Sequence, residues 1–160
     1  MIDGTLDIIF TNLASILQTG LQAYDSRALV SPEMPTSVPS LPYGWLQPSM
    51  QGGTFSMDTL QGGTIGAKVA GTFVETHNIE FVWFVGNRND PNLPAVEREW
   101  RKWHRRVLLI LMAHLTLNGT VYDTTLHSYR PAMLTVQDGT YVGASYRIEI
   151  TTRPAVSLLP

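Results

Sequence analysis

The residues best suited to chemistry are five basic side chains within nine positions: Arg98, Arg101, Lys102, Arg105 and Arg106. A helix advances about 100° per residue, so this spacing places them on one side of a single helix. Such a surface can contact phosphates or an acidic surface on a partner protein. It can also be a solvated helix face, because Glu97 lies four positions before Arg101 and suits an ion pair with it. The sequence leaves all three interpretations open.

The remaining reactive residues form no recognised catalytic or metal-binding motif. The four histidines lack the spacing of a zinc-binding HExxH helix. The chain has no cysteine, which excludes disulfides and thiolate metal sites. The glycine cluster at 62–66 lacks the lysine of a phosphate-binding loop. We therefore expect neither an enzyme nor a metal or cofactor site. The enzymatic alternative is a site assembled from scattered groups such as Asp123 and His127.

Length and composition favour one domain without membrane contact. A chain of 160 residues fits a single domain, 1–160. Its 11 basic and 13 acidic residues argue against a surface devoted to nucleic acid or anionic lipid. The longest apolar run, Val107 to Leu115, is too short to span a bilayer. No signal peptide is evident near the N-terminus. We expect a protein made in a cytoplasm.

The first half of the chain predicts one helix followed by irregular, extended structure. A stripe of apolar residues spaced three and four apart predicts a helix over residues 3–19, with Gly20 closing its end: Ile2, Leu6, Ile9, Leu13 and Ile16. Five prolines between Ser31 and Pro48 restrict any strand there, most plausibly 40–47, to a sheet edge or to a short length. Residues 51–71 hold six of the thirteen glycines and predict a glycine-rich loop or an extended hairpin.

Strand signals follow on both sides of a long helix. Residues 78–86 are apolar on both faces, which predicts a central, covered strand, and the alternation over 64–76 leads into it. After the helix, 120–129 predicts a strand that Pro131 breaks. Two β-rich runs joined by Asp138 and Gly139 predict a hairpin over 132–152. The tail, 153–160, is expected to be loose.

The long helix, from Pro94 to Leu117, has two different halves. One stripe is apolar throughout and includes Trp100, Trp103, Val107, Ile110, Leu111 and His114. We expect His114 to be a core histidine with a satisfied hydrogen bond. On the opposite side, the charges give way to Leu108, Leu109 and Met112. A helix that is apolar all round must be covered on both sides.

These elements predict an α+β fold: a mostly antiparallel sheet of about four to five strands with two helices packed against it, plus the glycine-rich hairpin or loop. The sheet can cover one side of the long helix, and another subunit or partner would cover the other. The candidate interface residues are Leu108, Leu109 and Met112 on the helix and Phe55, Met57 and Leu60 in the glycine-rich stretch. We expect at least one of these two surfaces to lie in an interface.

This order of elements resembles the tail terminator, or tail completion, proteins of long-tailed bacteriophages. The likeness extends from Ile2 to about Thr152. It is carried by the amphipathic first helix, the proline-rich approach Pro35–Pro48, the apolar strand ending at Val85 and Gly86, the polar turn Asn87–Asn92, the helix Ala95–Leu117 and the closing strand Thr140–Thr151. Two departures, the turn Pro91–Pro94 and the basic, tryptophan-bearing front of the helix, leave open a related role as a head–tail connector or neck protein.

The resemblance implies a structural virion protein, assembled in the host cytoplasm and located in the tail or neck. Members of the family form hexameric rings on the last ring of the tail tube, stop its growth and present a surface to the head-side connector. The implied partners are further copies of the chain, the tube protein and a connector or neck protein, with DNA at most passing through the lumen. The alternative of another class is a small nucleic-acid-binding protein that uses the basic helix face at 98–106.

Overall fold

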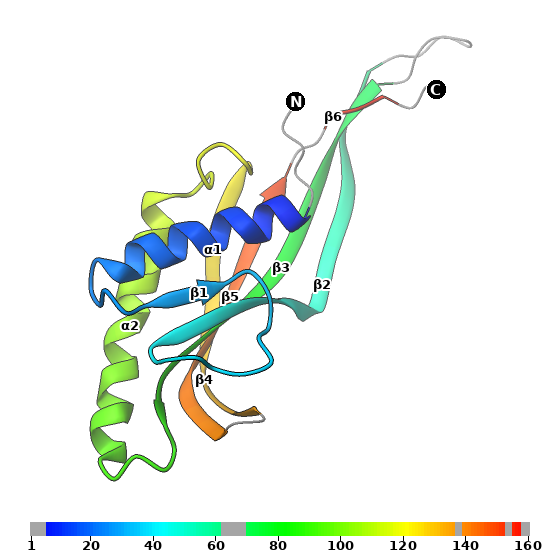
Figure 1. Ribbon diagram of the computed structural model, residues 1–160. Coiled ribbons are helices and arrows are strands. Elements are labelled where there is room, and N and C mark those ends of the chain that lie inside the picture. The colour runs from blue at the N-terminus through cyan, green and yellow to red at the C-terminus, as the bar shows by residue number, and fades with distance from the viewer. Residues whose placement is uncertain (1–5, 62–69, 137–138, 153–154, 158–160) are drawn as a thin grey trace.

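The computed structural model describes residues 6–61, 70–136, 139–152 and 155–157, and for 55–61, 70–73, 136 and 155–157 it describes the backbone alone. The elements are α1 (Leu6–Gln22), β1 (Leu29–Ser31), β2 (Tyr43–Gln61), β3 (Ala70–Asn87), α2 (Leu93–Ala113), β4 (Asp123–Val136), β5 (Gly139–Thr152) and β6 (Ala155–Ser157). The strands form one sheet in the order β1-β2-β3-β5-β4, with β6 also paired to β3. Only β1 and β2 pair in parallel. Both helices pack on the same face of the sheet (Figure 1), which confirms the α+β class.

Strand β3 is the centre of the sheet, because it pairs with β2 on one side and with β5 on the other. Phe81 and Trp83 are fully buried in the cluster that includes both helices. Val82 and Phe84 are buried on the opposite face. The prediction of a central strand covered on both sides is therefore confirmed. The predicted alternation over 64–76 is described from Ala70 onward, and these residues belong to β3 as well.

Part of the sheet face away from the helices is covered by the chain's own proline-rich segment. A second, smaller apolar cluster lies there, formed by Val38, Tyr43, Trp45, Val82, Phe84 and Tyr141. Val38 belongs to the connection between β1 and β2, and Leu41 of the same connection packs against this cluster. The prolines therefore shape a covering segment as well as limiting strand formation.

The strand expected at 40–47 is longer and less peripheral than predicted. It is the start of β2, which continues to Gln61 along β3, while β1 pairs with its other side only from Tyr43 to Trp45. The short β1 is the edge instead. Pro48 is tolerated inside β2 because β1 has already ended, and the register with β3 shifts immediately afterwards, between Pro48 and Gly53.

The described part of the glycine-rich stretch lies in an arm of the sheet. Residues up to Gln61 in β2 pair with residues from Ala70 onward in β3, and β6 (Ala155–Ser157) pairs with the other side of β3 there. The choice between the predicted loop and the predicted extended hairpin stays a prediction. The connection, 62–69, lies outside the described residues. Figure 1 shows the two strands continuing beyond the layer of helices.

Pro131 does not break the strand after the long helix, so that prediction was wrong. Strand β4 runs through it, and Pro131 faces Ala144 of β5. Because β4 is an edge strand, a residue without an N–H can sit in it without removing a bond to a second neighbour. The predicted hairpin is confirmed as β4 and β5, although 137–138 of its turn lie outside the described residues.

Three residues of the tail that was expected to be loose lie in a strand. Residues 155–157 form β6 and pair with Ala70, Gly71 and Thr72 of β3. Residues 153–154 and 158–160 lie outside the description. The pairing places β6 at the far end of the sheet, beside the arm (Figure 1).

Helix α1 extends past the glycine that was expected to end it. The helix continues to Gln22, so Gly20 lies inside it. A Cβ at Gly20 would lie only 2.6 Å from Cγ1 of Ile110, which is on α2. Glycine is therefore needed here for the close approach of the two helices and not for a turn. Within the predicted stripe, Ile9, Leu13 and Ile16 are buried but Leu6 is exposed.

Helix α2 buries the stripe that its periodicity predicted, but it ends earlier than expected. Trp103, Val107, Ile110 and Leu111 are buried. The helix stops at Ala113, and Nδ1 of His114 lies 2.9 Å from the backbone oxygen of Ile110. The expectation of a histidine with a satisfied hydrogen bond is confirmed, although His114 is half-buried.

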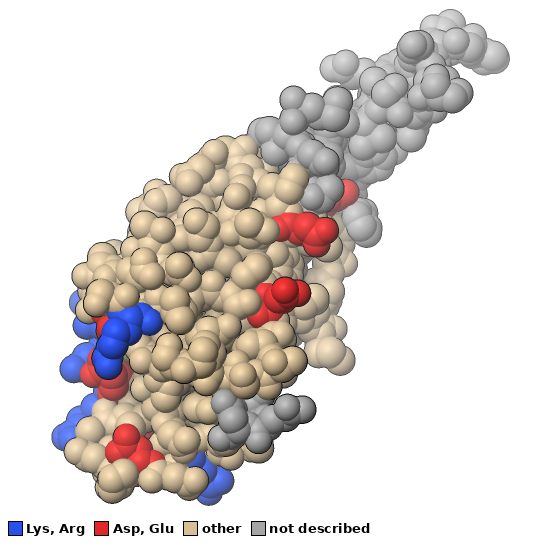
Figure 2. Space-filling view, in the orientation of Figure 1, with Lys and Arg blue, Asp and Glu red and all other residues tan. Residues whose placement is uncertain are grey.

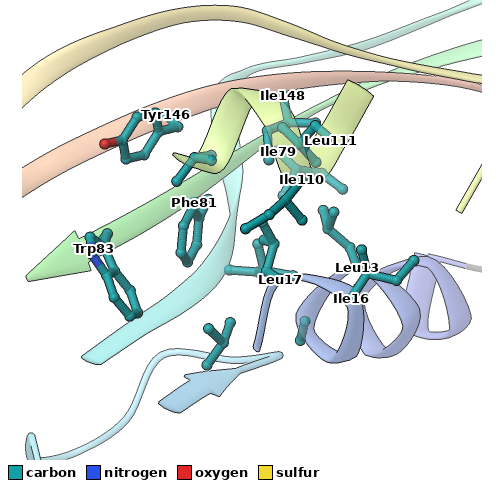
Figure 3. Packing of buried hydrophobic residues seen from close by; sticks show 14 of the residues in the cluster. Leu13, Ile16, Leu17, Ile79, Phe81, Trp83, Ile110, Leu111, Tyr146 and Ile148 are labelled. Atoms are coloured by element: carbon teal, nitrogen blue, oxygen red, sulfur yellow. The ribbon is translucent and has the colours of Figure 1, made fainter. Parts of the chain in front are cut away.

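The main core lies between the helices and the sheet. Figure 3 shows Leu13, Ile16 and Leu17 of α1 and Ile110 and Leu111 of α2 pointing toward Ile79, Phe81, Tyr146 and Ile148 of the sheet. Trp83 and Trp103 meet edge to face, with ring centroids 5.2 Å apart. This aromatic contact ties α2 to the central strand, in a geometry that favours aromatic pairs.

Replacing Gly20 by valine should lower the free energy of unfolding by about 1–3 kcal/mol, because the added side chain overlaps Ile110 and forces the helices apart. Chemical denaturation followed by tryptophan fluorescence measures the change. Thr19→Val is the control, since it places valine at the exposed neighbouring position and should change stability by less than about 0.5 kcal/mol. Unchanged stability in Gly20→Val would contradict the close packing of α1 on α2.

Candidate functional site

The surface of α2 that points away from the core is apolar from Leu108 to the end of the helix. Leu108 is 39% exposed, Leu109 49% and Met112 59%. Leu115, just after the helix, is exposed as well. The sequence predicted that these side chains would need cover from outside the subunit. Within the described part of the chain, these side chains remain exposed, as an interface would require. The interface itself stays a prediction.

The basic residues on α2 fall into two groups with different surroundings. The guanidinium of Arg106 lies over the rings of Tyr24 and Trp103, at 4.7 Å and 4.4 Å from their centroids. Nζ of Lys102 lies 3.1 Å from a carboxylate oxygen of Glu99. Both are therefore engaged within the subunit. The ion pair of Glu99 with Lys102 joins residues three positions apart. The expected pair of Glu97 with Arg101 is not among the ion pairs of the described residues.

Arg98, Arg101 and Arg105 are exposed, and none has an ion-pair partner within the described residues. Arg105 lies three and four positions before Leu108 and Leu109, so it continues the exposed apolar surface toward the start of the helix. Figure 2 shows the blue residues gathered along the side of the molecule where α2 runs, with acidic residues among them. This mixed surface suits an acidic patch on a protein partner at least as well as it suits phosphates.

A groove of about 530 Å³ lies between the start of α1 and the residues around β1 and β2. Leu6 and Phe10 of α1 form one wall, Met34 and Pro48 form part of the other, and Leu46 is buried beneath them. Two exposed acidic residues, Asp7 and Glu33, also line the groove. The groove is mostly apolar, with negative charge as its charged component.

The sequence did not predict this groove. It forms from three segments that lie far apart in the chain, near residues 6–11, 32–34 and 46–48. The available signal was Phe10, an apolar residue that lies outside the predicted stripe of α1 and four positions after Leu6. An apolar residue outside the stripe indicates an additional contact, but it does not identify the segment opposite.

The polar half of the outer sheet face contains two groups of hydrogen-bonded side chains. The Gln47 amide donates to a carboxylate oxygen of Glu80 over 3.0 Å, and Arg130 lies 3.4 Å from the other oxygen of that carboxylate. Arg147 donates to the side chain of Gln51. These groups line two shallow grooves of about 290 Å³ and 370 Å³. The charges of Glu80 and Arg130 are paired with each other, whereas Arg147 is hydrogen-bonded to the neutral side chain of Gln51.

His104 on α2 contacts the sheet through aromatic side chains. Its Nδ1 lies 3.1 Å from the hydroxyl of Tyr146, and its ring centroid lies 3.8 Å from that of Tyr129. Burial lowers the pKa of His104. Burial, with Tyr129 adding to it, raises the pKa of Tyr146 well above its ordinary value. The two groups are thus held neutral, and a neutral imidazole nitrogen can accept the hydroxyl hydrogen bond.

The groups of the enzymatic alternative are not brought into a common site with further ligands. Asp123 begins β4, and His127 is exposed at the register irregularity between Leu126 and Ser128. Among the residues that the structure describes, no group of three or more His, Asp or Glu side chains could hold a metal ion.

Neither of the two helices is long and apolar enough to cross a membrane.

The interface candidates in the glycine-rich stretch are placed by their backbone. Phe55, Met57 and Leu60 lie in β2, opposite Glu75, Phe73 and Gly71 of β3. They belong to the arm that extends beyond the helices (Figure 1). Their side chains lie outside the description, so the interface role of these three residues stays a prediction.

Comparison with known proteins adds no assignment to this geometry: no family model matches the chain, and no curated protein matches it.

The pair of His104 with Tyr146 predicts a pH-dependent stability. A folded-state pKa below the unfolded value of 6.5 means that the unfolded chain binds more protons as the pH falls through that value. The free energy of unfolding should therefore decrease from about pH 7 downward until His104 is protonated in the folded state. Denaturation at a series of pH values measures this slope. It should weaken in His104→Phe and persist in the control His127→Gln, whereas an equal slope in both variants would contradict the assignment to His104.

The two sides of α2 predict opposite responses to the same substitution. Leu111 is 1% exposed, so Leu111→Asp places a charge in the core and should unfold the chain. Leu109 lies two residues earlier and is about half exposed, so Leu109→Asp should leave the subunit folded, within about 0.5 kcal/mol of the original chain. Circular dichroism and thermal melting compare the two. Unfolding of Leu109→Asp would place this side of α2 within the subunit core and the interface elsewhere.

Proposed function

We propose that this chain is a structural virion protein that forms a ring at the head-proximal end of a phage tail tube. The ring stops polymerisation of the tube and provides the surface for head–tail joining. Its partners are further copies of the chain, the tube protein and a connector or neck protein. The hexameric state follows from the resemblance alone, and DNA passes at most through the lumen. The protein resides in the virion and has no catalytic role.

The observation that carries this proposal is the exposed apolar surface of α2. Leu108, Leu109 and Met112 are adjacent on one helix face and remain in contact with water in the isolated subunit. Full burial of such side chains contributes about 1.5–3 kcal/mol each. A protein that assembles gains this free energy only in the assembly, which supports a subunit of a larger structure.

The long arm of β2 and β3 supports the same proposal. Its backbone extends past the helices that cover the rest of the sheet (Figure 1). Ordering such a segment costs about 1–2 kcal/mol per residue in backbone entropy. Contact with a neighbouring subunit or with the tube offsets this cost, and the arm is long enough to reach beyond its own subunit.

A head–tail connector or neck protein is the alternative within the same assembly, since it would use the same surfaces. The alternative of another class, nucleic-acid binding by the basic face, has less support. Arg106 is stacked on aromatic rings and Lys102 is paired, and Glu97 and Glu99 are interspersed with the free arginines. Phosphate contacts favour uninterrupted positive charge.

The proposal predicts rings. Light scattering and negative-stain microscopy of the purified protein, alone and with the tube protein of the same phage, should show closed rings or capped tubes. Leu109→Asp should remain folded but assemble at least about tenfold more weakly, because it places a charge in the interface. A chain that stays monomeric under both conditions and leaves tube length unchanged would overturn the proposal. Salt-sensitive binding to duplex DNA by that monomer would favour the nucleic-acid alternative instead.

A further inference from the structure

Two exposed surfaces of this subunit differ in shape and in charge. The first, here called the helix strip, consists of Arg105, Leu108, Leu109 and Met112 on α2. All four side chains are exposed, and Arg105 has no ion-pair partner within the described residues. The strip is convex, apolar over most of its length and positively charged at one end.

The second surface, here called the α1 groove, is the hollow lined by Leu6, Phe10, Met34 and Pro48 with Asp7 and Glu33. It is concave, and its volume of about 530 Å³ can accept several aliphatic side chains. Met34 is 55% exposed, and Leu6 is exposed as well, so apolar surface is open to solvent here too. Neither Asp7 nor Glu33 has an ion-pair partner among the described residues.

The two surfaces lie on different sides of the subunit. In Figure 1, α2 runs along one side, while the start of α1 and the segment after β1 lie toward the other. Figure 2 shows the same separation of charge: the basic residues lie on the α2 side, and the described surface around the start of α1 shows acidic residues. The strip therefore cannot fill the groove of its own subunit.

We propose that the helix strip of one subunit docks into the α1 groove of the next copy of this chain, with Arg105 facing Glu33 and Asp7. Leu108, Leu109 and Met112 enter the groove and are buried against Leu6, Phe10 and Met34. The charges suit each other in sign, and each apolar surface supplies the cover that the other lacks. This inference rests on the proposed ring and specifies which surfaces join its subunits.

Such a contact joins two different patches of the same chain. An interface of this kind is heterologous, so a copy that is bound through its strip keeps its groove free for a further copy, and a copy that is bound through its groove keeps its strip free. The chain of subunits closes into a ring when the rotation between neighbours is a whole fraction of a turn. The proposed pair of surfaces therefore accounts for a ring, whereas a patch that pairs with itself gives a dimer.

The charges are tested by reversal. Arg105→Glu and Glu33→Lys should each weaken association about tenfold or more, because like charges then face each other across the contact. The double variant, which restores opposite charges, should recover most of the association. The matched control is Arg98→Glu, which makes the same change on the same helix about two turns away and should assemble normally. Sedimentation velocity measures all four proteins.

The pairing of surfaces is tested by mixing two blocked proteins. Met112→Asp blocks the strip but leaves the groove intact, and Met34→Asp does the opposite. Both residues are exposed, so both variants should fold, as thermal melting will confirm. Each should be monomeric alone, and an equimolar mixture should give a heterodimer and no ring, because only one productive junction is available.

The outcomes separate this inference from the proposed function. If the original chain forms rings while the blocked proteins also form rings alone, or while their mixture stays monomeric, this pairing of surfaces is wrong and the ring stands. The same holds if reversal of Arg105 and Glu33 has no effect or if the double variant is not restored. If the original chain never assembles, the proposed function fails, and this inference fails with it.

Discussion

The run Phe81–Phe84 of β3 buries side chains on both faces of the sheet, and the rest of the chain is arranged to cover them. Phe81 and Trp83 require the helical layer, which α1 and α2 provide through one continuous core. Val82 and Phe84 require cover on the opposite face, where the segment between β1 and β2 supplies Val38. The long ladders to β2 and β5 satisfy the backbone of the same strand. A strand that is apolar on both faces thus explains why a mostly antiparallel sheet, usually exposed on one face, is also covered around Val82 and Phe84 on its outer face.

Only one side of helix α2 packs against this core. Trp103, Val107 and Leu111 close the inner layer, and the opposite side carries leucine and methionine where an isolated protein would carry charge. The sequence periodicity alone was sufficient to predict this division, because each side of a helix is defined by spacing within a single element. The exposed side of α2 and the groove beside α1 are both apolar with one sign of charge, and exposed apolar surfaces of this kind are the ones that the proposed assembly would cover.

Local patterns were sufficient for the fold class, the two helices, the central strand and the hairpin of β4 and β5, since each depends on residues that are close in the chain. The errors concern residues whose effect depends on distant neighbours. Pro131 and Pro48 were expected to limit strands, but their cost depends on whether a second strand needs the missing N–H. Gly20 was expected to end α1, but its role is set by Ile110 on the other helix. The α1 groove was missed because three separate segments build it.

Pro131 in β4 affects whether strands of other molecules can pair with this edge of the sheet. Strand β4 is an edge, and an exposed edge of regular backbone can recruit strands from other molecules and lead to aggregation. Pro131 removes one donor from the middle of this edge, and the exposed, charged Arg130 lies beside it. The irregularity between Leu126 and Ser128 interrupts the pairing geometry once more. Addition of a further strand along β4 is therefore disfavoured, so the proposed contacts between copies would form through side-chain surfaces and not through this edge.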